Sequence, residues 1–230
     1  MTQQSTRAGQ LHYELIRGFI DTCAVPSREE LQARLSCSSA ELGLAIEDLE
    51  DAHGIVLHPG THKVWAVHPF SAAPTPFVVQ SGKKKWWGNC TWCSLGIAVL
   101  VGEPCTIVTT LGAETDQVAL TVDEGKLNRT DLVVHFPIPM SQAWENVVYT
   151  CSTMLLFKDE NHVAEWCKRH RIPQGDVQPV EKVLELAKRW YTEHLSPDWT
   201  KKSANEARAI FTELGFTHPV WALPASEGRF

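Results

Sequence analysis

Residues 86–101 read WWGNCTWCSLGIAVLV, and the rest of the chain is organised around this stretch. Cys90 and Cys93 stand at the start of an apolar run that ends before Gly102 and Pro104, which are helix stop signals. The pattern predicts a short buried helix with two thiols at its N-terminus. Because free backbone amides and the helix dipole favour a thiolate there, we expect Cys93 to be reactive, with Cys90 one turn or less away.

Aromatic and hydroxyl side chains surround these two thiols. The tryptophans can exclude water and hold an apolar ligand, and a serine hydroxyl can relay a proton. We therefore expect Trp92, Trp87 and Ser94 to contact a substrate. Most free cysteines are small buried hydrophobic residues, and that interpretation is preferred for four others: Cys23, Cys37, Cys105 and Cys167.

The N-terminal region has the pattern of three helices followed by a hairpin, which is the order of a winged helix. Capping boxes begin two helices, at Ser27 with Glu30 and at Ser38 with Glu41. Gly54 stands where a left-handed residue would end the third helix, and residues 55–67 read as a hairpin. DNA binding is disfavoured, because the third helix carries five carboxylates: Glu41, Glu47, Asp48, Glu50 and Asp51.

The remainder of the chain predicts a sheet and then further helices. Four segments are rich in β-branched and aromatic residues and are expected as strands of a mixed or antiparallel sheet: Thr106–Thr110, Val118–Val122, Leu132–Phe136 and Val147–Phe157. Helical faces follow around Trp166 and Trp190, and a capping box begins a helix at Ser203 that ends at Gly215. Three aromatic anchors are expected in the tail: Trp199, Trp221 and Phe230.

These patterns predict an α+β fold in three parts. A winged-helix-like module occupies residues 1–70, a thiol-site domain occupies 77–172, and a helical extension occupies 173–230. Ser71–Pro76 is the expected linker, because it contains two prolines and little periodicity.

Composition restricts the class of partner. The 230 residues are 43% hydrophobic and carry a formal net charge of −6, which disfavours a strong nucleic-acid footprint. No apolar run is long enough to cross a bilayer, and residues 1–10 lack the apolar centre of a secretion signal, so a cytoplasmic location is expected. Seven cysteines without an export signal favour free thiols.

Two interpretations of the Cys90/Cys93 spacing start from the residues alone. A closed zinc site needs four ligands, and no second cysteine pair follows at finger spacing. His58 and His62 flank a turn of the expected hairpin and are poor candidates for metal ligands. A Cys90–Cys93 dithiol redox enzyme remains an alternative, although no clear βαβ unit surrounds the pair.

The cysteine segments resemble those of the organomercurial (alkylmercury) lyases. The resemblance rests on Trp92-Cys93-Ser94-Leu95 opening an apolar helix and on Cys151 further along the chain. It continues through Leu120–Val122, Leu156–Phe157 and residues 166–170, and the helical N-terminal region agrees with it.

The resemblance implies protonolysis of a carbon–mercury bond. Cys93 and Cys151 match the two family cysteines, which hold the soft metal while a proton is delivered to carbon. No cofactor is implied, since mercury is substrate or product. The implied partners are a small organometallic or thiol-reactive substrate and small thiols that accept the product.

The sequence departs from the family pattern at its acid. Gly96 occupies the position of the family's aspartate, Ser152 replaces a neighbouring cysteine, and Cys90 is an additional thiol. Cys90 could supply the missing proton, or Ser94 or another hydroxyl could relay one through water. Alternatively the chemistry has changed, and Cys90, Cys93 and Cys151 form a three-thiol site that binds or senses a soft metal.

Overall fold

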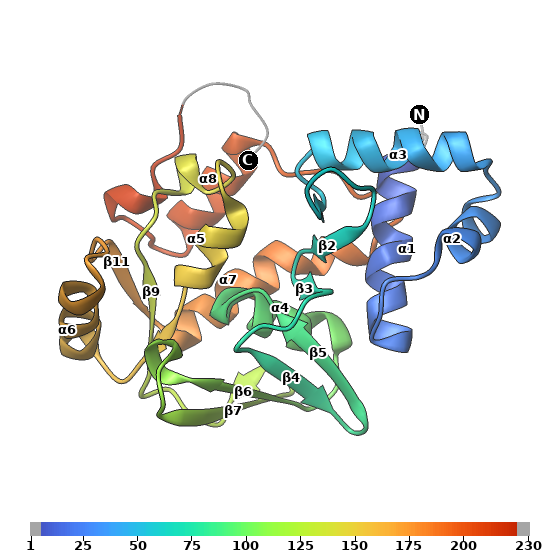
Figure 1. Cartoon of the computed structure of the whole chain (residues 1–230). Helices are drawn as coiled ribbons and strands as arrows, with labels where there is room; N and C mark the ends of the chain where they lie inside the picture. Colours follow the sequence, from blue (N-terminus) through green and yellow to red (C-terminus); the bar gives the residue numbers. More distant parts are fainter. Residues whose placement is uncertain (1–5, 225–230) are drawn as a thin grey trace.

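An eight-stranded antiparallel sheet is the larger of two sheets in the structure, which is a computed structural model describing residues 6–224 (Figure 1). Burial alternates along β6, as expected for a strand with one face against the core. The order is β1-β2-β3-β5-β4-β6-β7-β8. The strands are β1 Val56–Leu57, β2 Val64–Val67, β3 Phe70–Ser71, β4 Val78–Ser81, β5 Lys84–Gly88, β6 Cys105–Thr110, β7 Gln117–Asp123 and β8 Lys126–Leu127.

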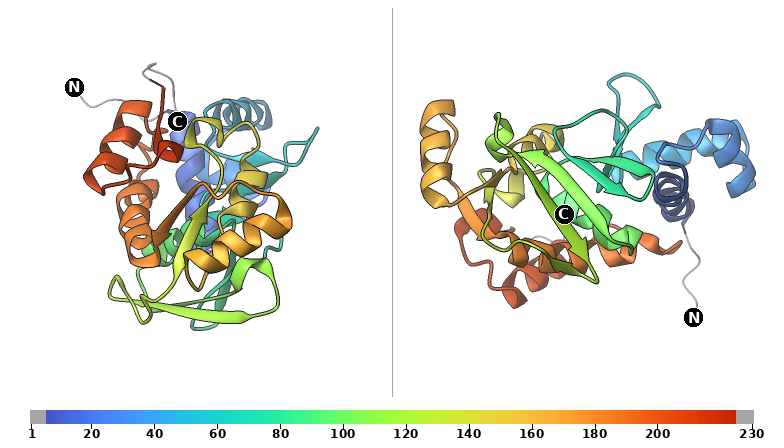
Figure 2. Two further views of the ribbon diagram at one scale, coloured as in Figure 1. Left: turned by 90° about the vertical axis from the view of Figure 1, so that its left-hand side faces the viewer. Right: turned by 90° about the horizontal axis from the view of Figure 1, so that it is seen from below.

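A three-stranded antiparallel sheet, in the order β10-β9-β11, lies with α6 at the opposite end of the molecule from the N-terminal helices (Figures 1 and 2). Its strands are β9 Val133–Phe136, β10 Leu156–Phe157 and β11 Asp176–Pro179. The helices are α1 Arg7–Thr22, α2 Arg28–Leu35, α3 Ser39–Asp51, α4 Thr91–Val101, α5 Val147–Thr153, α6 Glu160–His170, α7 Val180–Tyr191 and α8 Ala204–Glu213. The predicted α+β class is therefore confirmed.

Helix α4 is the buried helix expected from the opening stretch. It begins at Thr91 with Cys90 as its N-cap, and it ends at Gly102, which has a φ of 69°. It contacts α7 and strands β4, β5 and β6. A helix packed on several sides has to be apolar all round, which explains why residues 95–101 show no polar face.

The capping boxes predicted from sequence are confirmed. Ser27 with Glu30, Ser38 with Glu41, and Ser203 with Glu206 each make both reciprocal hydrogen bonds. Three helices, α1 to α3, are followed by the antiparallel pair β1–β2.

The expectation of a strand over Val147–Phe157 is wrong for most of that segment. Residues 147–153 form α5, and only Leu156–Phe157 pair as β10. Asn146 explains the difference, because its side chain accepts a hydrogen bond from the Tyr149 amide at 3.0 Å and caps the helix. This local cap outweighs the β propensity of the valines and threonines.

The predicted role of Gly54 is also wrong. His53 takes the left-handed conformation after α3, with a φ of 56°, and Gly54 follows it. A Cβ on Gly54 would lie 2.3 Å from Leu49 Cδ1, so this glycine permits close packing rather than an unusual φ.

The C-terminal part is integrated with the rest of the fold. One hydrophobic core includes Leu15 of α1, Leu95 of α4 and Trp190 of α7. Trp199 and Trp221 are buried, as expected of anchors, and Phe230 lies outside the described residues. Between residues 6 and 224, no helix is long and apolar enough to span a membrane.

Candidate active site

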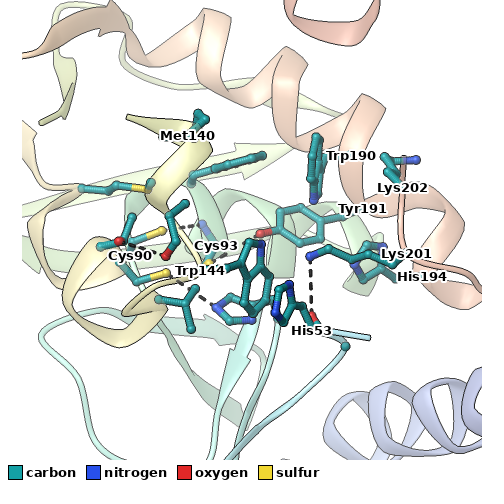
Figure 3. Close-up of a pocket in the computed structure, with 18 of the residues that line it drawn as sticks. His53, Cys90, Cys93, Met140, Trp144, Trp190, Tyr191, His194, Lys201 and Lys202 are labelled. Atoms are coloured by element: carbon teal, nitrogen blue, oxygen red, sulfur yellow. Dashed lines mark hydrogen bonds between the residues drawn. The ribbon is translucent and has the colours of Figure 1, made fainter. Parts of the chain in front are cut away.

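A cavity of about 710 Å³, counted with the open space at its mouth, lies over the N-terminus of α4 (Figure 3). Segments far apart in the sequence line it: α1, the turn after α3, the residue after β2, α4, α5, the end of α7, and the loop that precedes α8. The thiols that line it are Cys90, Cys93 and Cys151, all buried. The structure therefore brings together the three cysteines selected from the sequence.

Two of these thiols form a cluster with a histidine. The sulfurs of Cys93 and Cys151 and a ring nitrogen of His68 all lie within 4.8 Å of one another. Cys151 Sγ is 3.6 Å from His68 Nε2. Cys90 adjoins the cluster, since its sulfur accepts a hydrogen bond from the Cys93 amide at 3.3 Å. Two sulfurs and an imidazole are suitable ligands for a soft metal.

The environment selects one sulfur for ionisation. Burial opposes the thiolate of Cys93, but hydrogen bonds from Cys151 and Cys90, the nearby imidazole of His68 and the Tyr191 hydroxyl together hold its pKa well below the ordinary value. Burial raises the pKa of Cys90. Hydrogen bonding to Cys90 and Cys93 raises the pKa of Cys151. The pKa of Cys93 is thus lowered while those of Cys90 and Cys151 are raised, so Cys93 is the thiol of the cluster that ionises most readily.

The other expected contacts are placed differently. Trp92 is buried and lines the cavity. Trp87 is 38% exposed and lines a separate surface hollow with Phe19 and Lys85. The Ser94 hydroxyl donates to the carbonyl of Cys90, the N-cap residue, at 2.8 Å, so its hydrogen bond is made within the first turn of α4. Of the three expected substrate contacts, Trp92 is the one that faces the thiols.

Several cavity residues were not predicted from the sequence. Tyr191 lies at the end of α7, and its hydroxyl is 3.5 Å from Cys93 Sγ. Lys201 lies over the Trp144 ring at 3.7 Å, and burial holds the pKa of Lys201 well below its ordinary value. His12 stacks on Trp199 with a centroid distance of 3.7 Å, and burial lowers the pKa of His12 to about 3.

One sequence signal could have indicated such a contact. Gly96 is a glycine in the middle of an apolar helix, and such a glycine usually marks a close approach by another group. The sequence does not say which group approaches, because α7 is distant in the chain. His68 precedes a proline after a short strand, and nothing in its local sequence marks it as a neighbour of Cys151.

The fold and cavity define an α+β protein with a buried cysteine cluster open to a small ligand. The sequence matches the family model described as alkylmercury lyase over residues 70–192, more than half of the chain. The chain therefore belongs to the alkylmercury lyase family. No curated relative matches it.

A solved structure supports the fold. The crystal structure of the mercury-bound form of MerB2 is similar to this chain with a TM-score of 0.62 at 17% sequence identity. The similarity covers 83% of this chain and all of the other one.

Proposed function

We propose that this protein is a lyase that cleaves the carbon–mercury bond of a small organomercurial, with Cys93 and Cys151 as the working thiols and Cys90 as an accessory thiol. The observation that carries the proposal is that Cys93 and Cys151, both buried and far apart in the chain, line one cavity with their sulfurs within 4.8 Å of each other. Family membership and the likeness to a mercury-bound relative support it.

The residues divide the work according to their protonation. The Cys93 thiolate is the first ligand for mercury, because only the thiolate binds a soft metal. Cys151 can then join the metal from 4.8 Å or less, releasing its own proton. The apolar walls formed by Trp92 and Met140 suit the organic group of the substrate and exclude water. No cofactor is required, and small thiols outside the protein would accept the mercuric product.

Hydrocarbon release tests the proposal. We expect the protein, incubated with an alkylmercury compound and excess small thiol, to release the hydrocarbon, and Cys93→Ser to lower the rate by roughly 10³-fold or more. Gas chromatography of the headspace measures the product. Release that does not exceed the Cys93→Ser background would overturn the lyase proposal.

A second candidate function is soft-metal binding or sensing without cleavage. It is favoured by His68, which adds a nitrogen ligand to the two sulfurs. Titrating mercuric and cuprous ions against the unmodified protein and the Cys90→Ser, Cys93→Ser and Cys151→Ser variants tests it. Equal affinity in all four proteins would exclude a three-thiol site, whereas tight binding without hydrocarbon release would favour sensing.

A further inference from the structure

Carbon–mercury cleavage needs an acid, and no carboxylate lines the cavity in residues 6–224. Two hydroxyl side chains do line it, those of Thr150 and Tyr191. Thr150 donates its proton to the Ala143 carbonyl at 3.1 Å. Tyr191 is the hydroxyl that reaches a sulfur of the cluster, at 3.5 Å from Cys93 Sγ.

Gly96 makes room for the tyrosine ring. A Cβ placed on Gly96 would lie 2.3 Å from Tyr191 Cδ2 and 2.4 Å from Cε2, closer than any side chain could approach. Gly96 also lies three residues after Cys93, so its missing side chain would project on the same face of α4 as that cysteine. The ring thus occupies the space that a side chain at position 96 would otherwise fill beside the thiolate.

Neighbouring rings hold the Tyr191 side chain in place. Its centroid lies 6.0 Å from that of Trp92 and 5.0 Å from that of His194, and Tyr191 is only 2% exposed. Figure 3 shows its hydroxyl directed toward the cysteines from the end of α7. A ring fixed from both sides presents its O–H at one position, which is what a proton donor requires.

Resting on the lyase function proposed above, we propose that Tyr191 is the catalytic acid of this site and delivers the proton that releases the hydrocarbon. The reaction begins with the organic group and Cys93 both bonded to mercury. The phenol proton moves to the carbon, and the electron pair of the carbon–mercury bond becomes the new carbon–hydrogen bond. The Cys151 thiol returns a proton to the phenolate, and its sulfur bonds to mercury. Mercury remains divalent, and nothing is oxidised or reduced.

The Tyr191 hydroxyl is protonated in the free protein. In the free protein, burial and the charge of the Cys93 thiolate hold the pKa of Tyr191 well above its ordinary value, so the phenol keeps its proton.

Tyr191→Phe tests the assignment, because it keeps the ring and removes only the hydroxyl. In single-turnover experiments with an alkylmercury compound, we expect uptake by Cys93 to continue and hydrocarbon release to slow by about 10²-fold or more. Uptake is followed by loss of titratable thiol and release by gas chromatography. Tyr149→Phe is the matched control, since that tyrosine is 48% exposed, and it should leave both steps unchanged.

A second variant tests the packing. Gly96→Ala should displace the Tyr191 ring and slow release in the same way, whereas Gly43→Ala, at a helical glycine with open space around it, should not. Equal release by Tyr191→Phe and the unmodified protein would overturn the role of Tyr191 and leave the lyase function intact. Parallel loss of uptake and release would show that Tyr191 only stabilises the Cys93 thiolate. This result would also overturn its role as the proton donor. No release from the unmodified protein would overturn the lyase function itself, and the step assigned to Tyr191 with it.

Discussion

Two cysteine–histidine pairs in this protein have nearly the same geometry and very different surroundings. Cys151 Sγ lies 3.6 Å from His68 Nε2, and Cys167 Sγ lies 3.5 Å from His135 Nε2. The first pair lines the cavity with two more thiols. The second pair lies beside a separate small core around Trp166 and Phe157, away from that cavity.

The hydrogen bonds of the two imidazoles explain the difference. His135 Nε2 lies 2.8 Å from the Gln174 carbonyl and 3.2 Å from the Pro173 carbonyl, so it must carry a proton and donate to them. Burial alone raises the pKa of Cys167, whose thiol stays neutral. His68 instead faces sulfurs, and its imidazole helps to lower the pKa of Cys93. A nearby histidine is therefore not enough to activate a cysteine.

The largest expected difference is in the rate of hydrocarbon release after replacement of Cys151 or of Cys167. Cys151→Ser should slow hydrocarbon release by roughly 10²-fold or more, because the second sulfur ligand and its proton are lost. Cys167→Ser should change release by less than about twofold, since its sulfur is remote from the cavity. Release rates under saturating alkylmercury compare them, and similar losses in both variants would contradict the assignment of separate roles.

A smaller effect is expected when each histidine is replaced. His68→Gln should raise the pKa of Cys93, because the imidazole stabilises its thiolate. Since only the thiolate captures mercury, uptake by this variant should decline at a higher pH than in the unmodified protein and should be several-fold slower in mildly acidic buffer. His135→Gln should leave the pH profile unchanged. Stopped-flow measurement of uptake across a pH series tests both variants. An unshifted His68→Gln profile would contradict the stabilisation of the Cys93 thiolate by the His68 imidazole.

The smallest expected effect lies in the separate small core around Trp166 and Phe157, and it is an effect on stability alone. The buried Trp166 indole donates to the Gly112 carbonyl at 2.9 Å. Trp166→Phe leaves that carbonyl unpaired and should lower the free energy of unfolding by about 1–3 kcal/mol. Urea denaturation measures the change, and hydrocarbon release should be unaffected. Loss of release without loss of stability would show that this cluster takes part in function.

The sequence predicted local structure well wherever a cap or an apolar pattern controls it. The capping serines, the buried helix after Cys90 and the strands around Ile107 and Leu120 all follow from short-range signals. The segment after Asn146 was mistaken for a strand, because one capping side chain reversed the propensity of its neighbours.

The candidate site was predictable only in part. Cys93 and Cys90 are marked by their place before an apolar helix, and Cys151 was found through a family resemblance. The inclusion of Trp87 among the substrate contacts relied on proximity in sequence, but this strand residue, three positions before the helix cap, is 38% exposed and lies outside the cavity lining.

By itself, the sequence of this protein determined that two thiols stand at the start of α4 and that position 96 carries no acid, since both depend on residue identity and local backbone. Only the tertiary structure decided that the Tyr191 ring lies in the space left beside Gly96. Tyr191 reaches Cys93 because α7 packs against α4, and His68 reaches Cys151 because the residue after β2 and helix α5 line the same cavity. These contacts join residues far apart in the chain, and the packing of the core rather than any local pattern brings them together.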